Sequence, residues 1–296
     1  MKIKLFALFL FFMMFGCSRK EQTSEIVTTI YPFKAIIQEL AGDRFSVKII
    51  LPAGADPHTY EMIPSDFQSI QNSRVFFYGA ETLDGWAAKL NVQNKIELLS
   101  LVPKEYLIDI KIPHFHHGED HHNHTEHLGV DPHFWTDPNV VQAMIPNLLN
   151  ELIKLDPQGE SIFRSNAEKF VSNLIKLDKK IKNETDSLKF RNVFTAHPFY
   201  SYFFERYGLN VAGSLEIAPG SQPTPKDIKK LLDLVKQENV KAIFTHKQHS
   251  DKPAKVLAQS SGINEYEIDP IGGVNGRMSY AEIILFNLQI IKEALK

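Results

Sequence analysis

Residues 157–188 read PQGESIFRSNAEKFVSNLIKLDKKIKNETDSL, and the rest of the chain is organised around them. Six apolar residues in this stretch follow one another at steps of 4, 3, 4, 3 and 4 residues, which predicts one continuous helical stripe. About 30 helical residues at 1.5 Å each span roughly 45 Å. We therefore predict a rigid helix over 157–188 that links two lobes in a monomer; the alternative is a short dimerising coiled coil. The six residues are Phe163, Ala167, Phe170, Leu174, Leu177 and Ile181.

On the N-terminal side of this helix, residues 25–156 alternate short apolar runs with helical stretches. Strands that alternate with helices indicate βαβ units and a parallel sheet. The predicted strands are 25–30, 46–51, 74–78 and 95–99, and the predicted helices are 33–40, 65–72 and 86–90.

Residues 189–296 repeat the same pattern. Thr224 is expected to cap a helix with Pro225 at its first position, because threonine at the cap and proline just inside favour a helix start. The predicted class is therefore α/β, with two lobes of parallel-sheet βα units. The predicted strands are 192–195, 210–212, 240–245 and 266–268, and the predicted helices are 224–239 and 279–295.

Composition and charge narrow the choice of partners. The chain is 43% hydrophobic and 23% charged, as in soluble globular proteins. A formal net charge of −2 gives no electrostatic reason to expect nucleic acid. Neither GxGxxG nor GxxxxGK[ST] occurs, so no phosphate-binding glycine loop is predicted.

Residues 1–16 have the features of an export signal. Lys2 and Lys4 precede an apolar run from Leu5 to Phe15, which is too short to span a membrane. Cys17, the only cysteine, follows directly after a glycine, a pattern that resembles a bacterial lipoprotein signal. We expect export, lipidation of Cys17 and a polar tether over 17–24; the alternative is an ordinary cysteine within an export signal.

Seven of the twelve histidines lie within residues 114–127, together with three acidic residues. This stretch has no hydrophobic periodicity, so we predict a solvated loop. Imidazole beside carboxylate is a usual ligand set for zinc, which indicates weak, exchangeable metal binding; a polar loop without such a role is the alternative. The seven are His114, His116, His117, His121, His122, His124 and His127.

Four further residues of metal-ligand type stand at predicted loop mouths: His58, His133, His197 and Asp269. His58 and His133 each follow a proline, and His197 and Asp269 each end a predicted strand beside a proline. Ligands of open α/β sheets collect at the carboxyl ends of the strands. Four such residues at comparable places in two similar lobes indicate a shared site.

The motifs PHTYE (57–61), DPHFW (131–135), AHPFYSYFFERYGL (196–209) and IDPIGG (268–273) occur in family order. In them the chain resembles the solute-binding lipoproteins of bacterial ATP-binding-cassette importers for zinc or manganese. The resemblance covers the mature chain and implies one metal ion held in the cleft between two lobes, with a membrane permease and its ATPase as partners. It also implies that the ligands are His58, His133, His197 and Asp269.

The ligand types favour zinc over manganese, because imidazole suits zinc whereas manganese prefers oxygen. His197 stands where manganese members of the family more often carry a carboxylate. The chain departs from the family at Thr245-His-Lys-Gln-His249, where an acidic residue is expected. His246 and His249 are interpreted as ordinary loop histidines, with an outer-shell role or a fifth metal contact as the alternatives.

Two other functions are weighed against metal import. A secreted zinc hydrolase would need an open metal position and a general base, and HExxH is absent, so no enzyme is predicted. A surface adhesin or metal-buffering lipoprotein fits the sequence as well, and a neighbouring permease and ATPase would distinguish import from it.

Overall fold

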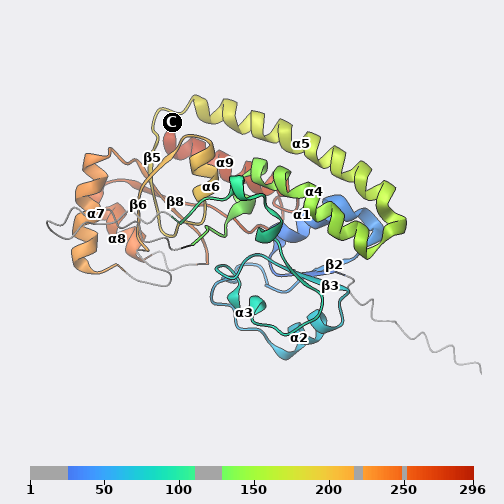
Figure 1. Cartoon of the computed structure of the whole chain (residues 1–296). Coiled ribbons are helices and arrows are strands. Elements are labelled where there is room, and N and C mark those ends of the chain that lie inside the picture. Colours follow the sequence, from blue (N-terminus) through green and yellow to red (C-terminus); the bar gives the residue numbers. More distant parts are fainter. Residues whose placement is uncertain (1–25, 111–128, 217–222, 249–251) are drawn as a thin grey trace, which may run out of the picture.

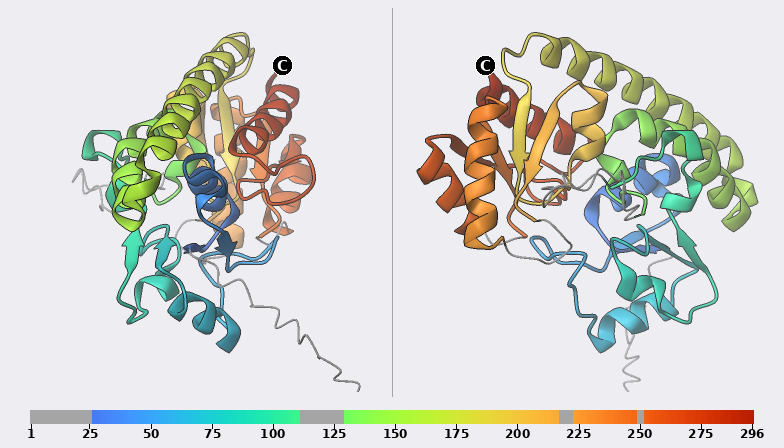
Figure 2. Two further views of the ribbon diagram at one scale, coloured as in Figure 1. Left: turned by 90° about the vertical axis from the view of Figure 1, so that its right-hand side faces the viewer. Right: turned by 60° about the vertical axis from the view of Figure 1, so that its left-hand side comes forward.

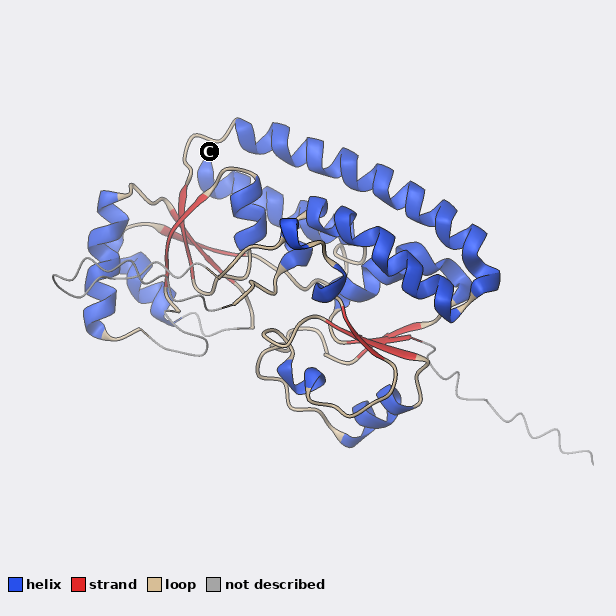
Figure 3. Ribbon diagram, in the orientation of Figure 1, coloured by secondary structure: helices blue, strands red, loops and turns tan. Residues whose placement is uncertain are grey.

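A computed structural model describes residues 26–110, 129–216, 223–248 and 252–296. Within these ranges the chain forms two four-stranded sheets, and every strand pair in both is parallel. The sheets lie in separate lobes (Figure 3), which confirms the predicted fold class. The first sheet has the order β2-β1-β3-β4 and the second β6-β5-β7-β8. Their strands are β1 (Ile26–Thr28), β2 (Val47–Ile49), β3 (Val75–Tyr78), β4 (Lys95–Glu97), β5 (Asn192–Thr195), β6 (Asn210–Ser214), β7 (Ala242–Thr245) and β8 (Asn264–Glu267).

Six of the nine α-helices of the described residues lie where helices were predicted, with ends that differ by a few residues. Thr224 caps α7 as expected, since its hydroxyl accepts a hydrogen bond from the Asp227 N–H and Pro225 is the first helical residue. The α-helices of the described residues are α1 (Tyr31–Ala41), α2 (Pro64–Gln71), α3 (Gly85–Ala88), α4 (Pro138–Leu155), α5 (Glu160–Asp186), α6 (Ser201–Arg206), α7 (Pro225–Gln237), α8 (Lys252–Ser261) and α9 (Tyr280–Leu295).

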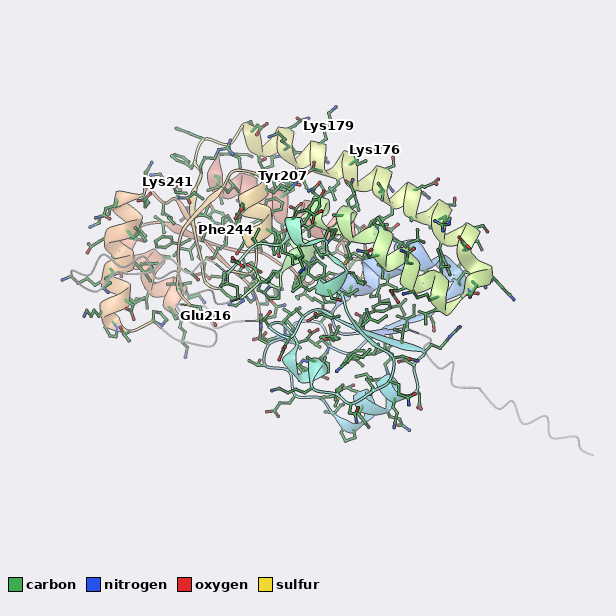
Figure 4. The ribbon with its side chains drawn as sticks, in the orientation of Figure 1. Lys176, Lys179, Tyr207, Glu216, Lys241 and Phe244 are labelled. Atoms are coloured by element: carbon green, nitrogen blue, oxygen red, sulfur yellow. The ribbon has the colours of Figure 1, made fainter. Side chains whose placement is uncertain are left out.

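The long helix runs along one side of both lobes (Figure 1). It consists of a 3-10 turn at Pro157–Gly159 and then α5, and all six residues of the predicted stripe are buried. Lys176 and Lys179, which lie between stripe positions, are exposed on its outer face (Figure 4). Helices α1, α4 and α9 pack against α5, so elements from both ends of the chain contact one rod.

Helix α4 was not identified from the sequence, and neither were α6 and α8. Asp137 caps α4 by accepting a hydrogen bond from the Asn139 N–H at 2.7 Å, and Pro138 is its first residue. Pro146 lies inside α4, where a proline removes one backbone donor. The helix continues because its buried face packs along α5. The predicted long helix between the lobes is confirmed, and α4 packs along it (Figures 1 and 2).

One hydrophobic core extends through both lobes. It runs from Ile26 on β1, through the stripe of α5, to Leu295 at the end of α9. A second, smaller cluster lies beneath α7 and α8. Because most of the apolar interior is shared, a large separation of the lobes would expose it to water. None of the helices in the described ranges has the length and hydropathy needed to cross a bilayer.

One glycine shapes the second sheet at a close approach. A Cβ atom on Gly213 would lie 2.8 Å from the ring of Phe194 on the neighbouring strand. The register between β5 and β6 also shifts at Val193 and Phe194. The glycine therefore admits the Phe194 ring against β6, next to the strand end that carries His197.

Candidate metal centre

Three of the four residues expected as ligands lie together. One ring nitrogen from each of His58, His133 and His197 can be chosen so that all three lie within 4.8 Å of one another. The ring centroids are 5.5 Å apart for His58 and His133, 5.1 Å for His58 and His197, and 5.2 Å for His133 and His197. Such spacing permits three nitrogens to contact one ion, since Zn–N distances are about 2.0–2.1 Å.

His58 lies in the loop after β2 and is the least buried of the three. Its backbone N–H donates to Oδ1 of Asp56 at 2.9 Å. The indole N–H of Trp86 donates to the carbonyl of Pro57 at 3.2 Å, which anchors the loop to α3. The loop is thus held at the two residues that precede His58.

His133 is held in a similar way and more tightly. Oδ1 of Asp131 accepts from the backbone N–H of His133 at 2.8 Å, and Nδ1 of the same histidine lies 2.8 Å from this oxygen. The sequence Asp-Pro-His therefore folds alike at 56–58 and 131–133, with an aspartate turning the chain by accepting the N–H two residues on. At 131–133 the aspartate also holds the ring.

The segment that carries His133 is fastened to the C-terminal lobe. The hydroxyl of Tyr202 donates to the Asp131 carbonyl at 2.9 Å, and the Trp135 indole donates to the Pro270 carbonyl at 2.9 Å. The hydroxyl of Tyr280 donates to the Trp135 carbonyl at 2.8 Å. His133, 4% exposed, therefore stands where the two lobes meet.

His197 comes from the other lobe, two residues after the end of β5, and is 7% exposed. Its Nδ1 forms a hydrogen bond with Oε2 of Glu216, which follows β6, and the Glu216 N–H donates to the Ala196 carbonyl at 3.0 Å. Glu216 and Lys241 lie toward opposite ends of the C-terminal sheet (Figure 4). Since Lys241 precedes β7 and Glu216 follows β6, His197 and Glu216 share the carboxyl-terminal edge, as predicted for His197.

The two carboxylates determine which ring nitrogen is available to an ion. When Nδ1–H donates to Asp131 or Glu216, Nε2 carries the lone pair. A carboxylate behind a histidine in this way orients the ring and raises its basicity as a metal ligand. Neither Asp131 nor Glu216 was identified from the sequence. Asp131 repeats the Asp-Pro-His pattern of Asp56, a local signal that could have found it, whereas Glu216 lies 19 residues from His197 and has no such signal.

Asp269 is not brought into the group. Its Oδ1 accepts from the N–H groups of Ile271 at 3.1 Å and Gly272 at 2.9 Å, and its Oδ2 forms an ion pair with Nε of Arg277 at 3.2 Å. Its backbone is fixed by two hydrogen bonds of 2.8 Å with the side chain of Asn287 on α9. In this structure the carboxylate shapes the loop after β8, and its expected role as the fourth ligand stays a prediction.

His246 lies beside the group, at the end of β7. It is 6% exposed, and its ring centroid is 5.9 Å from that of His197. Both rings face a small pocket that also contains the other two histidines. The residues lining it are Asp56, Pro57, His58, His133, Trp135, His197, Phe199, His246, Gln248, Pro270 and Ile271.

Several predictions concern residues outside the described ranges. These are the signal over 1–16, the tether with Cys17, the seven histidines of 114–127, and His249.

Comparison with known proteins places the chain in a family. The model of the family described as zinc-uptake complex component A, periplasmic (ZnuA), matches residues 26–294. The chain is 26% identical over 288 residues to the manganese-binding lipoprotein MntA of Halalkalibacterium halodurans, covering 95% of this chain and 91% of that protein. It is 25% identical over 287 residues to the high-affinity zinc uptake system protein ZnuA of Bacillus subtilis, covering 91% and 87%.

Among solved structures, one similar fold is the laminin binding protein (Lmb) of Streptococcus agalactiae, described as bifunctional with adhesin and metal transporting activity. It is 27% identical, with a TM-score of 0.77 over 92% of this chain and 100% of that one. The relatives are thus named for zinc and for manganese. The match over residues 26–294 shows that the chain belongs to the ZnuA family of metal-binding, solute-binding proteins.

Proposed function

We propose that this protein captures one Zn2+ ion outside the cytoplasm and delivers it to a membrane permease driven by an ATPase. The observation that carries the proposal is the group of His58, His133 and His197, which joins imidazoles from both lobes within 4.8 Å. Two of the three rings have a carboxylate on Nδ1, which leaves Nε2 for an ion.

Zinc is preferred over manganese because all three side chains offer nitrogen. Imidazole suits zinc, whereas manganese is better served by carboxylate, carbonyl and water. A relative named for manganese is about as similar in sequence as one named for zinc, so the choice between the two metals is argued from the ligand types of the site. Zinc is the transported solute in this proposal and takes part in no reaction.

For the remaining regions we keep the division proposed from the sequence. Residues 1–16 are the export signal, Cys17 is lipidated, and 17–24 tether the protein to the membrane. Residues 25–156 and 189–296 form the lobes on either side of the helix over 157–188. The histidines of 114–127 bind metal weakly and raise its concentration near the tight site.

Binding is expected to involve local ordering, with little movement of the lobes. The hydrophobic core passes continuously from β1 through α5 to α9, and wide opening would break it. His58 is the exception, since it sits on a loop and is more exposed than His133 or His197. We expect the His58 loop to open when zinc enters and when it leaves.

The direct test is metal analysis of protein purified without added metal, followed by competitive titration of zinc against manganese. We expect one tight zinc equivalent. His197→Ala should lower its affinity by more than about 100-fold, beyond the roughly 10–100-fold effect of losing an outer-shell partner. His116→Ala, which removes one loop imidazole, is the matched control. Unchanged affinity in His197→Ala would show that the site is wrongly assigned.

A deletion separates the tight site from the loop. Removal of 113–128 should keep the one tight equivalent and lower the total zinc bound at saturation. Loss of the tight equivalent would contradict this division of roles.

The described adhesin activity of the structural relative makes surface adhesion the second candidate. The two are distinguished in cells. Deletion of the gene should impair growth only at low zinc if the protein serves import, and should impair attachment with normal zinc uptake if it serves adhesion alone.

A further inference from the structure

We propose that His246 is the fourth ligand of the metal site, so that in this chain four imidazoles hold the ion and Asp269 stays outside. The inference rests on the proposed function and specifies the donor set of the same site. It follows from the position of His246, from the contacts of its ring, and from the hydrogen bonds and ion pair that already hold the Asp269 carboxylate.

His246 and His197 project from adjacent parallel strands. β5 and β7 pair directly, with Thr195 opposite Phe244, so the residues that follow these strands emerge side by side at one edge. The His246 ring is buried and packs edge-on against Phe199, with centroids 4.2 Å apart. Phe199 in turn stacks on His197, with centroids 6.3 Å apart. His246 and the candidate ligand His197 therefore both pack against the ring of Phe199.

The ring of His246 has an oxygen beside Nδ1, as the rings of His133 and His197 have. Its Nδ1 lies 2.8 Å from Oε1 of Gln248, a carbonyl oxygen that can only accept. When Nδ1–H donates to this oxygen, Nε2 carries the lone pair, as described for His133 and His197. His246 is not among the three residues whose ligand nitrogens lie within 4.8 Å of one another, so its side chain would have to move for Nε2 to join them.

Asp269 would have to give up more to reach the ion. Its carboxylate accepts from two backbone N–H groups and pairs with Arg277, whose guanidinium also lies 4.1 Å from the centre of the Phe286 ring. Moving it would leave these donors without their acceptor in a largely buried loop, which is costly. The guanidinium charge so near the carboxylate also opposes the approach of a cation. The balance favours His246.

A set of four nitrogens has a consequence for selectivity. With no oxygen ligand from the protein, a tetrahedral zinc site is well satisfied, whereas manganese loses the harder ligands that it prefers. His246 is then a residue that determines specificity, at the place where the chain reads Thr-His-Lys-Gln.

The test is X-ray absorption spectroscopy of the full mature protein loaded with one zinc equivalent, because scattering from imidazole rings reports their number. We expect four imidazoles in the wild type, three in His246→Gln, and four in both Asp269→Asn and the loop control His249→Gln. Zinc affinity should fall by roughly tenfold or more in His246→Gln, which corresponds to about 1.4 kcal/mol, and little in the control.

His246→Glu provides a second measurement that does not depend on loss of binding. A carboxylate at this position should retain one tight zinc equivalent and shift the ratio of zinc to manganese affinity toward manganese. Three imidazoles in the wild type, together with a changed spectrum in Asp269→Asn and none in His246→Gln, would overturn the assignment. If the wild type holds no tight zinc at all, the proposed function fails instead, and the two results are distinguishable.

Discussion

The two sheets share one strand order, and β1 and β5 hold the same place in it. Two residues beyond the end of β1 lies Ile30, which is fully buried in the core. Two residues beyond the end of β5 lies His197, whose ring faces the other imidazoles. The same strand end therefore supplies a core residue in one lobe and a candidate ligand in the other.

The N-terminal lobe contributes its imidazoles from loops instead. His58 and His133 both follow an Asp-Pro step in which the aspartate accepts the histidine N–H. The turns that carry them form between near neighbours in the chain, whereas the His197 ring is bound by Glu216, which follows an adjacent strand. One half of the site is thus organised by local turns and the other by sheet pairing.

At the edge of the N-terminal sheet, a carboxylate stabilises the strand ends without facing the metal group. Asp84 is fully buried, and its oxygens accept from the Thr29 hydroxyl at 2.6 Å, the Gly79 N–H at 2.9 Å and the Ala80 N–H at 3.0 Å. The two lobes therefore use the same edge differently, one for folding and one for binding.

The largest expected effect tests whether both lobes hold the same ion. Zinc at 100 times its Kd should stabilise the wild type by about 2.7 kcal/mol, because it binds only the folded state. His58→Ala and His197→Ala, one from each lobe, should each lose most of this gain, and His116→Ala should keep it. Thermal unfolding with and without zinc measures this stabilisation. If His58→Ala or His197→Ala kept the full stabilisation by zinc, the two lobes would not hold the same ion.

The next effect compares the two ways of holding an imidazole. Glu216→Gln and Asp131→Asn should each weaken zinc binding by about 10–100-fold, since each alters the partner of Nδ1. Asp131→Ala should also lower the free energy of unfolding, and by more than Glu216→Ala, because it removes the oxygen that accepts the His133 N–H, which asparagine would keep. Competitive titration and urea unfolding measure the two quantities. Asp233→Asn, on the exposed face of α7, is the control. Equal stability losses in Asp131→Ala and Glu216→Ala would argue against the local turn.

The third effect concerns pH. Burial raises the pKa of Asp84 from 3.8 to about 6, so the folded state binds this proton more tightly than the unfolded chain. Its contribution to stability is complete below the unfolded pKa and is lost as the pH rises through about 6. Between pH 4.5 and 7 the free energy of unfolding should fall by about 2 kcal/mol on this account.

Asp84→Asn should remove that part of the pH dependence. Urea unfolding of metal-free protein at both pH values gives the difference between variant and wild type, in which the shared titration of the histidines cancels. A variant with the full wild-type slope would show that Asp84 titrates normally.

Much of the fold could be predicted because it depends on periodicity. The stripe of α5 and the short strand segments between helical stretches are local patterns, and the structure has a strand or helix at each of them. Helix α4 was missed although Asp137 and Pro138 mark its start. Pro146 interrupts its interior, and the packing that offsets this proline comes from α5, which no local pattern reveals.

The site, like the fold, could be predicted only as far as local sequence patterns determine it. His58, His133 and His197 were proposed from loop position and family motifs, and the structure brings them together. The positions of Asp269 and His246 depend on Arg277 and on the pairing of β5 with β7, which are set by tertiary structure. Sequence identifies residues of ligand type, and the fold decides which of them face one another.

The smallest expected effect returns to the contrast between the lobes. In the N-terminal lobe, α1 begins at Tyr31 after Ile30, which gives no side-chain cap, and the buried face of the helix holds it in place. In the C-terminal lobe, α7 is capped by Thr224 and Asp227 and buries only Leu231 and Val235. Thr224→Ala should therefore lower the free energy of unfolding by about 1 kcal/mol.

Ser172→Ala on the exposed side of α5 removes a hydroxyl that caps no helix, and should change stability by a few tenths of a kcal/mol at most. Because α7 follows Glu216 along the chain and packs on β6, zinc affinity should stay unchanged in Thr224→Ala if the cap serves folding alone. Urea unfolding paired with zinc titration measures both. A loss of affinity with the loss of the cap would mean that the position of β6, and through it Glu216 and His197, depends on how α7 begins.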